Sequence, residues 1–535
     1  MRELRADVAV IGGGLGGVAA ALAAARGGRM VVLTEETDWL GGQLTSQGVP
    51  PDEHPWIEQF GCTATYREFR DQLRDHYRRW YPLSAEARTE RYLNPGRGTV
   101  SALCVEPSAG VAVLEGMLAP LRSAGRLRVL TEHRPVGASV DRDRVTSITL
   151  ERADFEQVTV VADYVLDATE TGELLQLADV EHVAGAESRD ETGEANAPEV
   201  ADPSNMQAVS WCFAVDHLDG ADHTIERPPS YDFWRIHEPP AWGGPLLSFT
   251  APVPRTGEPF TRTFVPNPDQ GEDTVVDHRL VGGDNELWAF RRIADRRTFS
   301  SGHLASDITL VNWPMIDYFE GPVYGELPGV SEGHLHGARA LSFSFLFWLQ
   351  TEAPRPDGGT GYPGLRLRPD VMGTVDGLAK RPYIRESRRI RAEYTIVEQD
   401  VALDSRPDGR AQSYQDSVGV GSYRIDLHPS TGGDGYIDIA SCPFELPLRA
   451  LVPVRMRNLL PAAKNIGTTH ITNGCFRLHP VEWGIGEVAG SLAAFCLAER
   501  CTPQDVSSNA TMLELFQAQL VADGVELRWP DVRGY

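Results

Sequence analysis

The densest group of chemically capable side chains lies between residues 464 and 480, where two histidines and an arginine are close together in the sequence. Imidazole titrates near neutral pH, so His470 and His479 are candidates for a base that removes a proton from a substrate. The planar guanidinium of Arg477 suits a substrate carboxylate or a developing negative charge, and a salt bridge to Glu482 is its alternative role. The segment predicts proton transfer on a small organic molecule.

A glycine pattern near the N-terminus predicts the element that binds a ligand for this chemistry. Gly12, Gly14 and Gly17 form a G-x-G-x-x-G spacing between an apolar run and an Ala-rich segment. A strand, a tight turn and a helix in this order place backbone N–H groups and the positive end of a helix dipole where a pyrophosphate binds. A second strand is expected to end at Glu35, near the offset at which a carboxylate meets a ribose 2′-OH. The expected ligand is an unphosphorylated dinucleotide, NAD or FAD.

Other segments are expected to approach the same ligand. The glycine-rich residues 39–48 predict a loop, and residues 164–172 predict a buried strand that stops at small polar residues. Residues 459–463 predict a further strand. Residues 66–81 predict an amphipathic helix, whose aromatic side chains either pack in the core or surround a substrate. Residues 484–490 are expected to open a helix after the loop that carries His470 to His479, and the N-terminus of such a helix stabilises negative charge.

The length, the net charge and the cysteine spacing limit the classes of protein to which the chain can belong. A chain of 535 residues exceeds what one hydrophobic core usually covers, so two domains are expected. The formal charge of −25 argues against a nucleic-acid partner. No membrane-spanning segment or signal peptide is expected. The seven cysteines form no C-x-x-C pair, which removes the common metal and thiol redox motifs and fits a reduced, cytoplasmic enzyme with no metal site.

Together these motifs resemble a known class of flavoproteins. The glycine loop, the strand ending in Thr169 and the helix at 484–490 resemble the FAD-contacting segments of the glutathione-reductase-like flavoprotein superfamily. Residues 39–48, 382–389 and 465–490 further resemble the FAD-dependent oxidoreductase family. The resemblance implies an α/β fold with a Rossmann-like FAD-binding domain, discontinuous in sequence, and an inserted α+β substrate domain. The implied domains are residues 1–175 and 451–535 for FAD and residues 176–450 for the substrate.

The resemblance also implies residue roles. Glycines 12, 14 and 17 would hold the pyrophosphate, and Glu35 would bind the adenosine ribose. One departure from the pattern is Glu170, because the usual Ala-Thr-Gly is here Ala-Thr-Glu-Thr-Gly and puts a carboxylate near the phosphates. The remaining cofactor contacts implied are Gly42 and Gln43 beside the phosphates and ribityl chain, Val136 at the adenine, Thr169 at the end of its strand, and Val481 and Glu482 at the pyrimidine edge of the flavin.

The function implied is an FAD-dependent oxidoreductase that dehydrogenates a small organic substrate, such as an amine, an alcohol or a secondary-metabolite intermediate, by hydride transfer to flavin N5. No second G-x-G-x-x-G with its strand and acid follows, so the electron acceptor is expected to diffuse to the flavin. A nicotinamide-dependent dehydrogenase and a flavin-containing protein without turnover are the alternatives. The electron acceptor (oxygen, a quinone or another protein), a covalent link to FAD through Cys475 and the oligomeric state stay open.

Aromatic and polar residues of the middle region are candidates for the substrate pocket. Asn312, Trp313, Tyr318 and Trp348 combine rings with polar tips, which suits an organic substrate, although core packing is the alternative. Residues 385–389 contain three arginines and a glutamate, which predict either pocket groups or an ion network at a domain interface.

Overall fold

The computed structural model of the protein describes residues 2–240, 242–268 and 285–534. Its largest sheet has seven strands, and β22, from near the C-terminus, pairs with the second half of β6. The strands β3, β2, β1, β6 and β22 are parallel, whereas β5 and β4 form an antiparallel hairpin on the first half of β6. The order is β3 (Leu127–Leu130), β2 (Val31–Thr34), β1 (Arg2–Ile11), β6 (Gln157–Asp167), β5 (Arg144–Glu151) and β4 (Arg134–Asp141), with β22 (Leu459–Pro461) beside β6.

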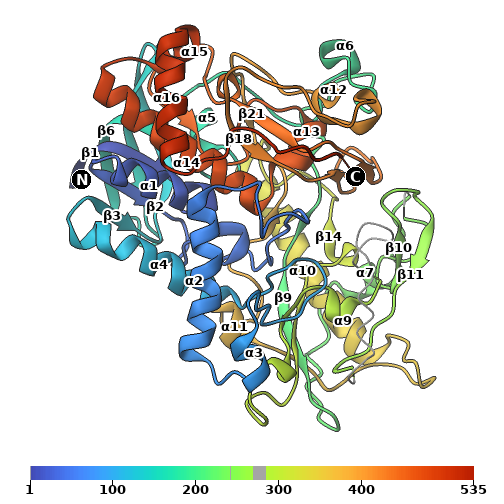
Figure 1. The fold of residues 1–535 in the computed structure, drawn as a ribbon. Coiled ribbons are helices and arrows are strands. Elements are labelled where there is room, and N and C mark those ends of the chain that lie inside the picture. The colour runs from blue at the N-terminus through green and yellow to red at the C-terminus, as the bar shows by residue number, and fades with distance from the viewer. Residues whose placement is uncertain (1, 241, 269–284, 535) are drawn as a thin grey trace.

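The order of these strands joins the two ends of the chain in one sheet. Strand β1 ends in a fully buried apolar run, and helix α1 (Leu15–Arg26) returns the chain to β2, as expected for a Rossmann-like unit. The first strands and the C-terminal helices accordingly lie together in Figure 1, in blue and red. The α/β fold is confirmed, while the domain boundaries near residues 175 and 450 stay a prediction.

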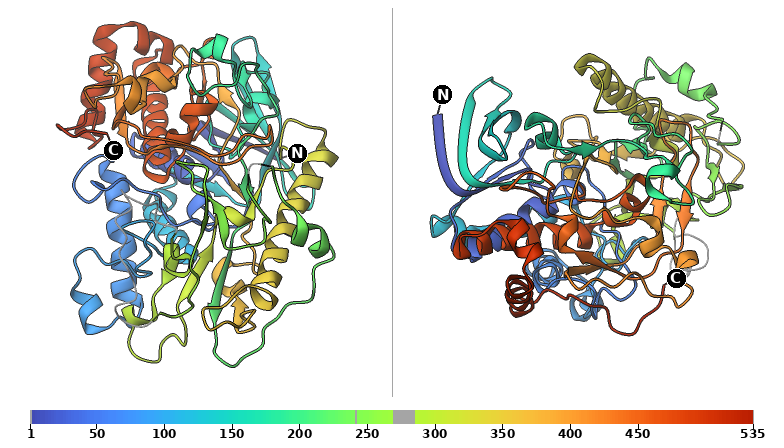
Figure 2. Two further views of the ribbon diagram at one scale, coloured as in Figure 1. Left: turned by 90° about the vertical axis from the view of Figure 1, so that its right-hand side faces the viewer. Right: turned by 90° about the horizontal axis from the view of Figure 1, so that it is seen from above.

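Helix α14 (His479–Glu499) packs along α1 so closely that two of its glycines admit no side chain. A Cβ atom on Gly486 would lie 1.9 Å from the carbonyl oxygen of Gly16. A Cβ atom on Gly490 would lie 2.2 Å from the carbonyl oxygen of Ala20. The glycines at 486 and 490 therefore serve helix–helix contact, and Figure 2 shows α14 beside α1 under the sheet.

The expected start of this helix was wrong. It begins at His479 rather than at Gly484, because Pro480 suits the first turn of a helix, where its missing N–H is not needed. The loop expected before it also contains a short helix, α13 (His470–Phe476). Thr469 caps α13 by accepting a hydrogen bond from the N–H of Thr472 at 3.1 Å.

Helix α2 (Ala64–Trp80) confirms the amphipathic pattern expected over residues 66–81. Phe69, Leu73 and Tyr77 are buried, whereas Trp80 is 70% exposed. The aromatic residues of this helix that face the molecule belong to the core, as the packing interpretation predicts.

The middle of the chain forms small antiparallel sheets and one long helix, α10 (Pro328–Thr351). This part extends away from the seven-stranded sheet, in green and yellow (Figure 2). It is of the α+β kind that the sequence predicts. One sheet has the order β12 (Arg292–Ala294), β13 (Ile308–Val311), β9 (Phe213–His217) and β15 (Leu365–Leu367), and another has β14 (Asp317–Tyr318), β8 (Val209–Ser210) and β16 (Tyr383–Ile384).

The other described helices and strands are short, apart from α4 and α16. They are α3 (Ala85–Thr89), α4 (Pro107–Ser123), α5 (Glu173–Leu177), β7 (His182–Val183), α6 (Arg189–Thr192), α7 (Tyr231–Ile236), β10 (Thr250–Pro252), β11 (Pro259–Thr261), α9 (Leu287–Phe290), α11 (Pro369–Met372), β17 (Arg389–Ile390), α12 (Glu398–Val401), β18 (Ser417–Gly421), β19 (Ile425–Leu427), β20 (Ile437–Ile439), β21 (Phe444–Pro447), α15 (Pro503–Ser508) and α16 (Ala510–Ala522).

Within the described part of the chain, α14 is the one helix long and apolar enough to cross a membrane. Of its most apolar 18-residue window, 83% is buried inside the molecule. A helix at the core of a folded protein has this same composition, and α14 packs against α1 over its length.

Candidate functional site

A pocket lies at the carboxyl ends of β1, β2 and β6, the edge where parallel α/β sheets bind ligands. It joins the glycine loop to the ends of two other strands and to the start of β4. Val136, predicted to contact adenine, lies on β4 directly after the lining residue Pro135. The lining residues are Gly12, Gly14, Thr34, Glu35, Glu36, His133, Pro135, Ala168, Thr169, Glu170 and Glu173.

The glycine loop has the geometry that a pyrophosphate requires. Gly12 has φ of 105°, and a Cβ atom there would lie 2.1 Å from the carbonyl oxygen of Ala168. A Cβ atom on Gly17 would lie 1.9 Å from the carbonyl oxygen of Gly12. A Cβ atom on Gly14 would lie 3.2 Å from side-chain oxygens of both Glu170 and Glu482. Gly14 is the N-cap residue of α1 and has no side chain of its own there, which leaves space for an anion at the positive end of the helix dipole.

Glu35 lies in the pocket at the end of β2, as the sequence predicts. Its carboxylate accepts hydrogen bonds from the N–H of Gly13 at 3.0 Å and from the N–H and hydroxyl of Thr37, both at 2.9 Å. Burial and the neighbouring charge of Glu36 raise the pKa of Glu35 to about 8. The carboxyl group is therefore largely protonated at neutral pH, and its contact with a ribose stays a prediction.

Glu170, the departure from the flavoprotein pattern, lies beside the glycine loop and pairs with Lys464. A Cβ atom on Gly42 would lie 2.6 Å from its Oε1 atom. Lys464 is buried, which by itself lowers the pKa of the amine, but the charges of Glu170 and Glu482 outweigh burial and raise that pKa. The ammonium group thus offsets a carboxylate that would otherwise repel a phosphate.

Gln43 and Glu482 connect the loop after β2 to both glycine-rich helices. The amide of Gln43 donates to Glu482 at 2.5 Å and to the carbonyl oxygen of Arg477 at 3.2 Å. The other carboxylate oxygen of Glu482 accepts from the N–H of Gly16 at 3.3 Å. Burial raises the pKa of Glu482 to about 7, although Lys464 lowers it. These predicted cofactor contacts therefore meet at one place.

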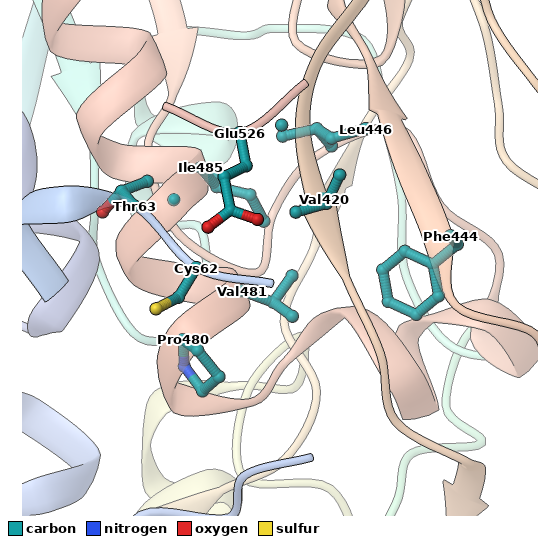
Figure 3. A pocket seen from close by; sticks show the side chains of 11 residues that line it. Cys62, Thr63, Val420, Phe444, Leu446, Pro480, Val481, Ile485 and Glu526 are labelled. Atoms are coloured by element: carbon teal, nitrogen blue, oxygen red, sulfur yellow. The ribbon is translucent and has the colours of Figure 1, made fainter. Parts of the chain in front are cut away.

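Val481 lies next to Glu482 in the chain but faces a different space. Its side chain lines a small apolar pocket between the first turn of α14 and strands β18 and β21 (Figure 3). Cys62 lines the same pocket, and burial raises the pKa of its thiol to about 12. The Val481 side chain thus packs in the core, and a backbone contact to the cofactor stays a prediction.

His479 is buried at the start of α14, with both ring nitrogens in contact with the backbone. Nδ1 accepts from the N–H of Asp52 at 3.2 Å, and Nε2 donates to the carbonyl oxygen of Val49 at 3.1 Å. Burial lowers the pKa of His479 to about 4. These contacts favour a neutral imidazole that holds residues 49–52 against the helix, and its role as a base stays an untested prediction.

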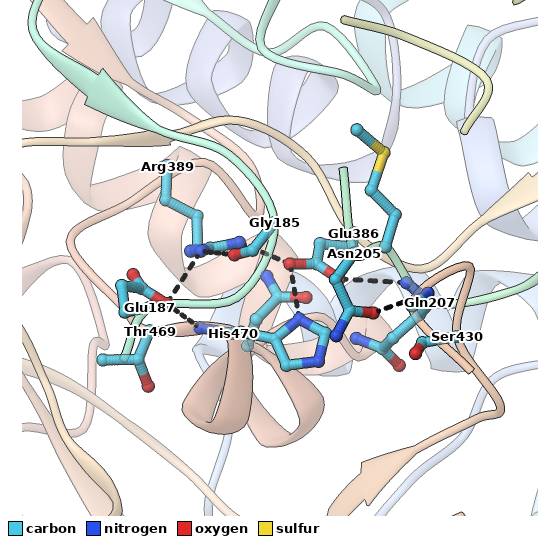
Figure 4. Close-up of polar contacts among 12 residues, drawn as sticks. Gly185, Glu187, Asn205, Gln207, Glu386, Arg389, Ser430, Thr469 and His470 are labelled. Carbon is cyan, nitrogen blue, oxygen red and sulfur yellow. Dashed lines mark hydrogen bonds and ion pairs between the residues drawn. The ribbon is translucent and has the colours of Figure 1, made fainter. Parts of the chain in front are cut away.

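His470 is the first residue of α13 and belongs to a buried ion network (Figure 4). Its Nδ1 atom lies 2.9 Å from Glu386, which also accepts from Arg389 at 2.5 Å. Burial by itself lowers the pKa of His470, but the charge and hydrogen bond of Glu386 outweigh it and raise the pKa. Arg389 also reaches Glu187 at 3.1 Å, so residues 385–389 form the predicted ion network.

Arg477 is buried and does not pair with Glu482, the alternative that the sequence leaves open. It donates to the hydroxyl of Tyr383 at 2.8 Å, to the carbonyl oxygen of Asp426 at 3.0 Å and to its carboxylate at 3.3 Å. Its Nε atom has no hydrogen-bond partner. Arg477 therefore links the start of α14 to β16 and β19.

A further group of buried polar side chains, next to Arg477, was not predicted from the sequence. We call these residues together the polar cluster. His428 lies between two carboxylates, with Nδ1 2.5 Å from Asp317 and Nε2 3.7 Å from Asp426. Asp317 also accepts from Arg385 at 3.0 Å. Burial alone would raise the pKa of Asp317, but Arg385 and His428 outweigh burial and lower it.

No local signal marks this group in the sequence. Asp317 lies on β14 and His428 directly follows β19, 111 residues later, so only the folded chain brings them together. Of the residues predicted to line a substrate pocket or to pack in the core, Trp313 and Trp348 pack in the core. Both rings contact Phe345, at centroid distances of 6.0 and 5.6 Å.

Comparison with known proteins agrees with this geometry. A model of the family described as FAD dependent oxidoreductase matches residues 7–520. No match was found among curated proteins. Several solved structures match this chain over less than half of its length and over less than half of their own. They include L-proline dehydrogenase from P. horikoshii (17% identity, 34% of this chain and 24% of that chain, TM-score 0.19) and OxyS anhydrotetracycline hydroxylase from Streptomyces rimosus (13% identity, 44% and 40%, TM-score 0.25).

The residues described above fit FAD. The glycine loop places the N-terminus of α1 beside the pocket where the pyrophosphate is expected, Glu35 lies where a ribose is expected, and Lys464 offsets the nearby carboxylates. The family match spans nearly the whole chain. The protein is therefore an enzyme of the FAD dependent oxidoreductase family, and FAD is its cofactor.

Proposed function

We propose that the enzyme dehydrogenates a small organic substrate in the polar cluster between the start of α14 and the middle sheets. The observation that carries this proposal is the buried chain of contacts from Arg477 through Asp426, His428 and Asp317 to Arg385. When bound, FAD supplies a hydride acceptor. The protein has to orient the substrate and take up the proton that leaves with the hydride.

His428 has the geometry of the proton acceptor. Asp317 accepts a hydrogen bond from the Nδ1–H of His428, so Nε2, which lies 3.7 Å from Asp426, is the ring nitrogen left to take up a proton. The side chain is 18% exposed, so a substrate O–H or N–H can reach it more readily than the enclosed ring of His479. A well-placed base that removes this proton raises the reaction rate by about 10²- to 10⁴-fold.

His470 is the second candidate for this role. Its Nδ1 atom is held by Glu386, and Nε2 has no hydrogen-bond partner among the described residues. The raised pKa works against it, since a base must be unprotonated before it can act.

Anaerobic reduction of the flavin tests the proposed function. We expect some members of a panel of amines, alcohols and hydroxy acids to bleach the flavin absorbance of the purified holoenzyme. A colourless protein that binds NAD would instead support a nicotinamide-dependent enzyme. A yellow protein that no member of the panel reduces would favour the alternative of a flavoprotein without turnover.

Conservative histidine variants identify the base. We expect His428→Gln to slow the rate of flavin reduction by about 10²-fold or more, whereas His479→Gln changes it by less than about threefold. The His479 variant retains a side chain that can hydrogen-bond residues 49–52. FAD content and melting temperature are measured on both proteins, so that a lost cofactor is not mistaken for lost chemistry. Equal rates in wild type and His428→Gln would remove His428 as the base.

A further inference from the structure

Buried nitrogen atoms without a hydrogen-bond acceptor gather around β16 and the strands β12 and β13. Fully enclosed polar groups are nearly always paired in folded proteins, so a group of unpaired donors calls for a partner. None of these donors has an acceptor among the described residues. The unpaired donors are Nε and Nη1 of Arg291, Nδ2 of Asn312, Nε2 of Gln47, Nε of Arg385 and Nε of Arg477, and the Oδ1 atom of Asn312 is an unpaired acceptor.

These donors belong to one region of the molecule. The side-chain amide oxygen of Gln47 accepts from the N–H of Ile384 at 3.3 Å, between Tyr383 and Arg385 on the same segment. Arg477 donates to Tyr383, and the guanidinium of Arg385 lies 5.0 Å from the centroid of that ring. The charge of Arg291 also acts on Tyr383. The three arginines therefore share Tyr383 as a neighbour.

Arg291 and Asn312 flank two adjacent strands of the middle sheet, because Arg291 directly precedes β12 and Asn312 directly follows β13. The N–H of Leu310 donates to the carbonyl oxygen of Arg291 at 3.0 Å, so these two residues are opposite each other. Asn312 lies two residues beyond Leu310, at the same end of the sheet as Arg291. Both residues are buried, at 9% and 5% exposure.

The cation of Arg291 is the least neutralised in the cluster. Within the described part of the chain its one ion pair is with Asp52 at 3.5 Å, which is too long for a hydrogen bond. Arg385 and Arg477 differ, because each donates hydrogen bonds to an aspartate and to another oxygen. A buried guanidinium with two unpaired nitrogens is costly unless an anion is bound beside it.

We propose that the substrate carries a carboxylate, which binds to Arg291 and to the amide of Asn312. The inference rests on the dehydrogenation proposed above. A carboxylate provides two oxygens with about four acceptor positions, which matches a surplus of donors better than a neutral carbonyl does. A charged acceptor also makes stronger hydrogen bonds to a guanidinium than a neutral one.

The first test uses small carboxylates as probes of the holoenzyme. Sodium benzoate and sodium acetate are titrated while the visible flavin spectrum and the melting temperature are followed, with benzamide and acetamide as neutral counterparts. We expect a saturable response to at least one carboxylate, with an affinity at least tenfold higher than that of its amide. Equal responses to carboxylates and amides, or no response to either, would overturn the proposal.

The second test introduces a carboxylate into the protein itself, where it competes with the carboxylate of the ligand. Asn312→Asp is nearly isosteric and places an anion beside the free N–H groups of Arg291, so we expect it to fold, to retain FAD and to bind the carboxylate at least tenfold more weakly. Arg366→Gln is the matched control, because Arg366 lies on β15 of the same sheet but is already paired with Asp216 at 2.6 Å. Unchanged binding in Asn312→Asp would contradict the assignment.

The two proposals can fail separately. If benzoate or acetate binds as expected and no compound of the panel bleaches the flavin, the carboxylate site stands and the dehydrogenation fails. If flavin is bleached equally fast by substrates with and without a carboxylate, and neither probe binds, the dehydrogenation stands and the carboxylate site is rejected.

Discussion

At the residue scale, Glu35 shows how burial prepares a side chain for a ligand. Its carboxyl group has three donors from the protein, yet burial keeps its pKa near 8. We expect Glu35→Gln to weaken FAD binding by about two- to tenfold, because a hydrogen bond between neutral groups contributes about 0.5–1.5 kcal/mol. Fluorescence titration of the apoprotein with FAD measures this. An unchanged dissociation constant would remove Glu35 from the ribose site.

The same carboxyl group predicts a pH dependence of the FAD-free protein. Its folded pKa of about 8 lies above the ordinary value of 4.5, so the folded state binds a proton that the unfolded state has released. The stability from Glu35 is full below pH 4.5 and is lost as the pH rises to about 8. We expect Glu35→Gln to flatten this part of the curve of melting temperature against pH. Parallel curves for both proteins would contradict the raised pKa.

At the scale of elements, the contact between α1 and α14 requires glycine, because the helices leave space for a hydrogen atom but not for a larger side chain. Because a Cβ atom on Gly486 would lie 1.9 Å from a backbone oxygen, we expect Gly486→Ala to destabilise the protein by about 1–3 kcal/mol or more and to lower its FAD content. Backbone atoms cannot move aside as a flexible side chain would. Thermal unfolding and the flavin absorbance of purified protein measure both effects.

Gly484 provides the control for this prediction on the same helix. The nearest atom to a Cβ there is a methyl carbon of Thr63 at 4.0 Å, so Gly484→Ala meets no obstacle. We expect it to raise stability slightly, by up to about 1 kcal/mol, since alanine is the better helix former. A similar loss of stability in both variants would mean that the close contact with α1 is not what requires glycine at position 486.

At the scale of the whole molecule, the cofactor cradle ties together parts of the chain that are far apart in sequence. Gly16, Gln43 and Glu482 are joined by hydrogen bonds, and Lys464 adds an ion pair to Glu170. A ligand held by these groups stabilises both ends of the chain at once. We expect FAD at 100 times its dissociation constant to raise the free energy of unfolding by about 2.7 kcal/mol.

Differential scanning fluorimetry of the apoprotein with increasing FAD measures this stabilisation. The melting temperature should rise with the logarithm of the FAD concentration well above the dissociation constant, and AMP should reproduce only part of the shift. A melting temperature that does not respond to FAD would mean that the ligand does not bind across the cradle.

The cofactor side of the site could be predicted from sequence because its signals are local. Gly12, Gly14, Gly17 and Glu35 lie within one strand–turn–helix–strand unit, and their roles follow from the backbone geometry of that unit. The strand at 459–463 and the packing of α2 were predicted for the same reason. The start of α14 was misplaced because glycines that serve helix contact were taken for a helix opening.

The sequence by itself predicted the α/β fold and the glycine loop of a dinucleotide site, since both depend on residues close together in the chain, and the resemblance of three separate segments indicated FAD. The tertiary structure decided which polar groups meet. His428 lies beside Asp317, Arg291 pairs through its backbone with Leu310, and His479 is held by the backbone of residues 49–52. Those contacts join strands and loops that are far apart in the chain, and the burial that sets their charges arises only when the strands pack together.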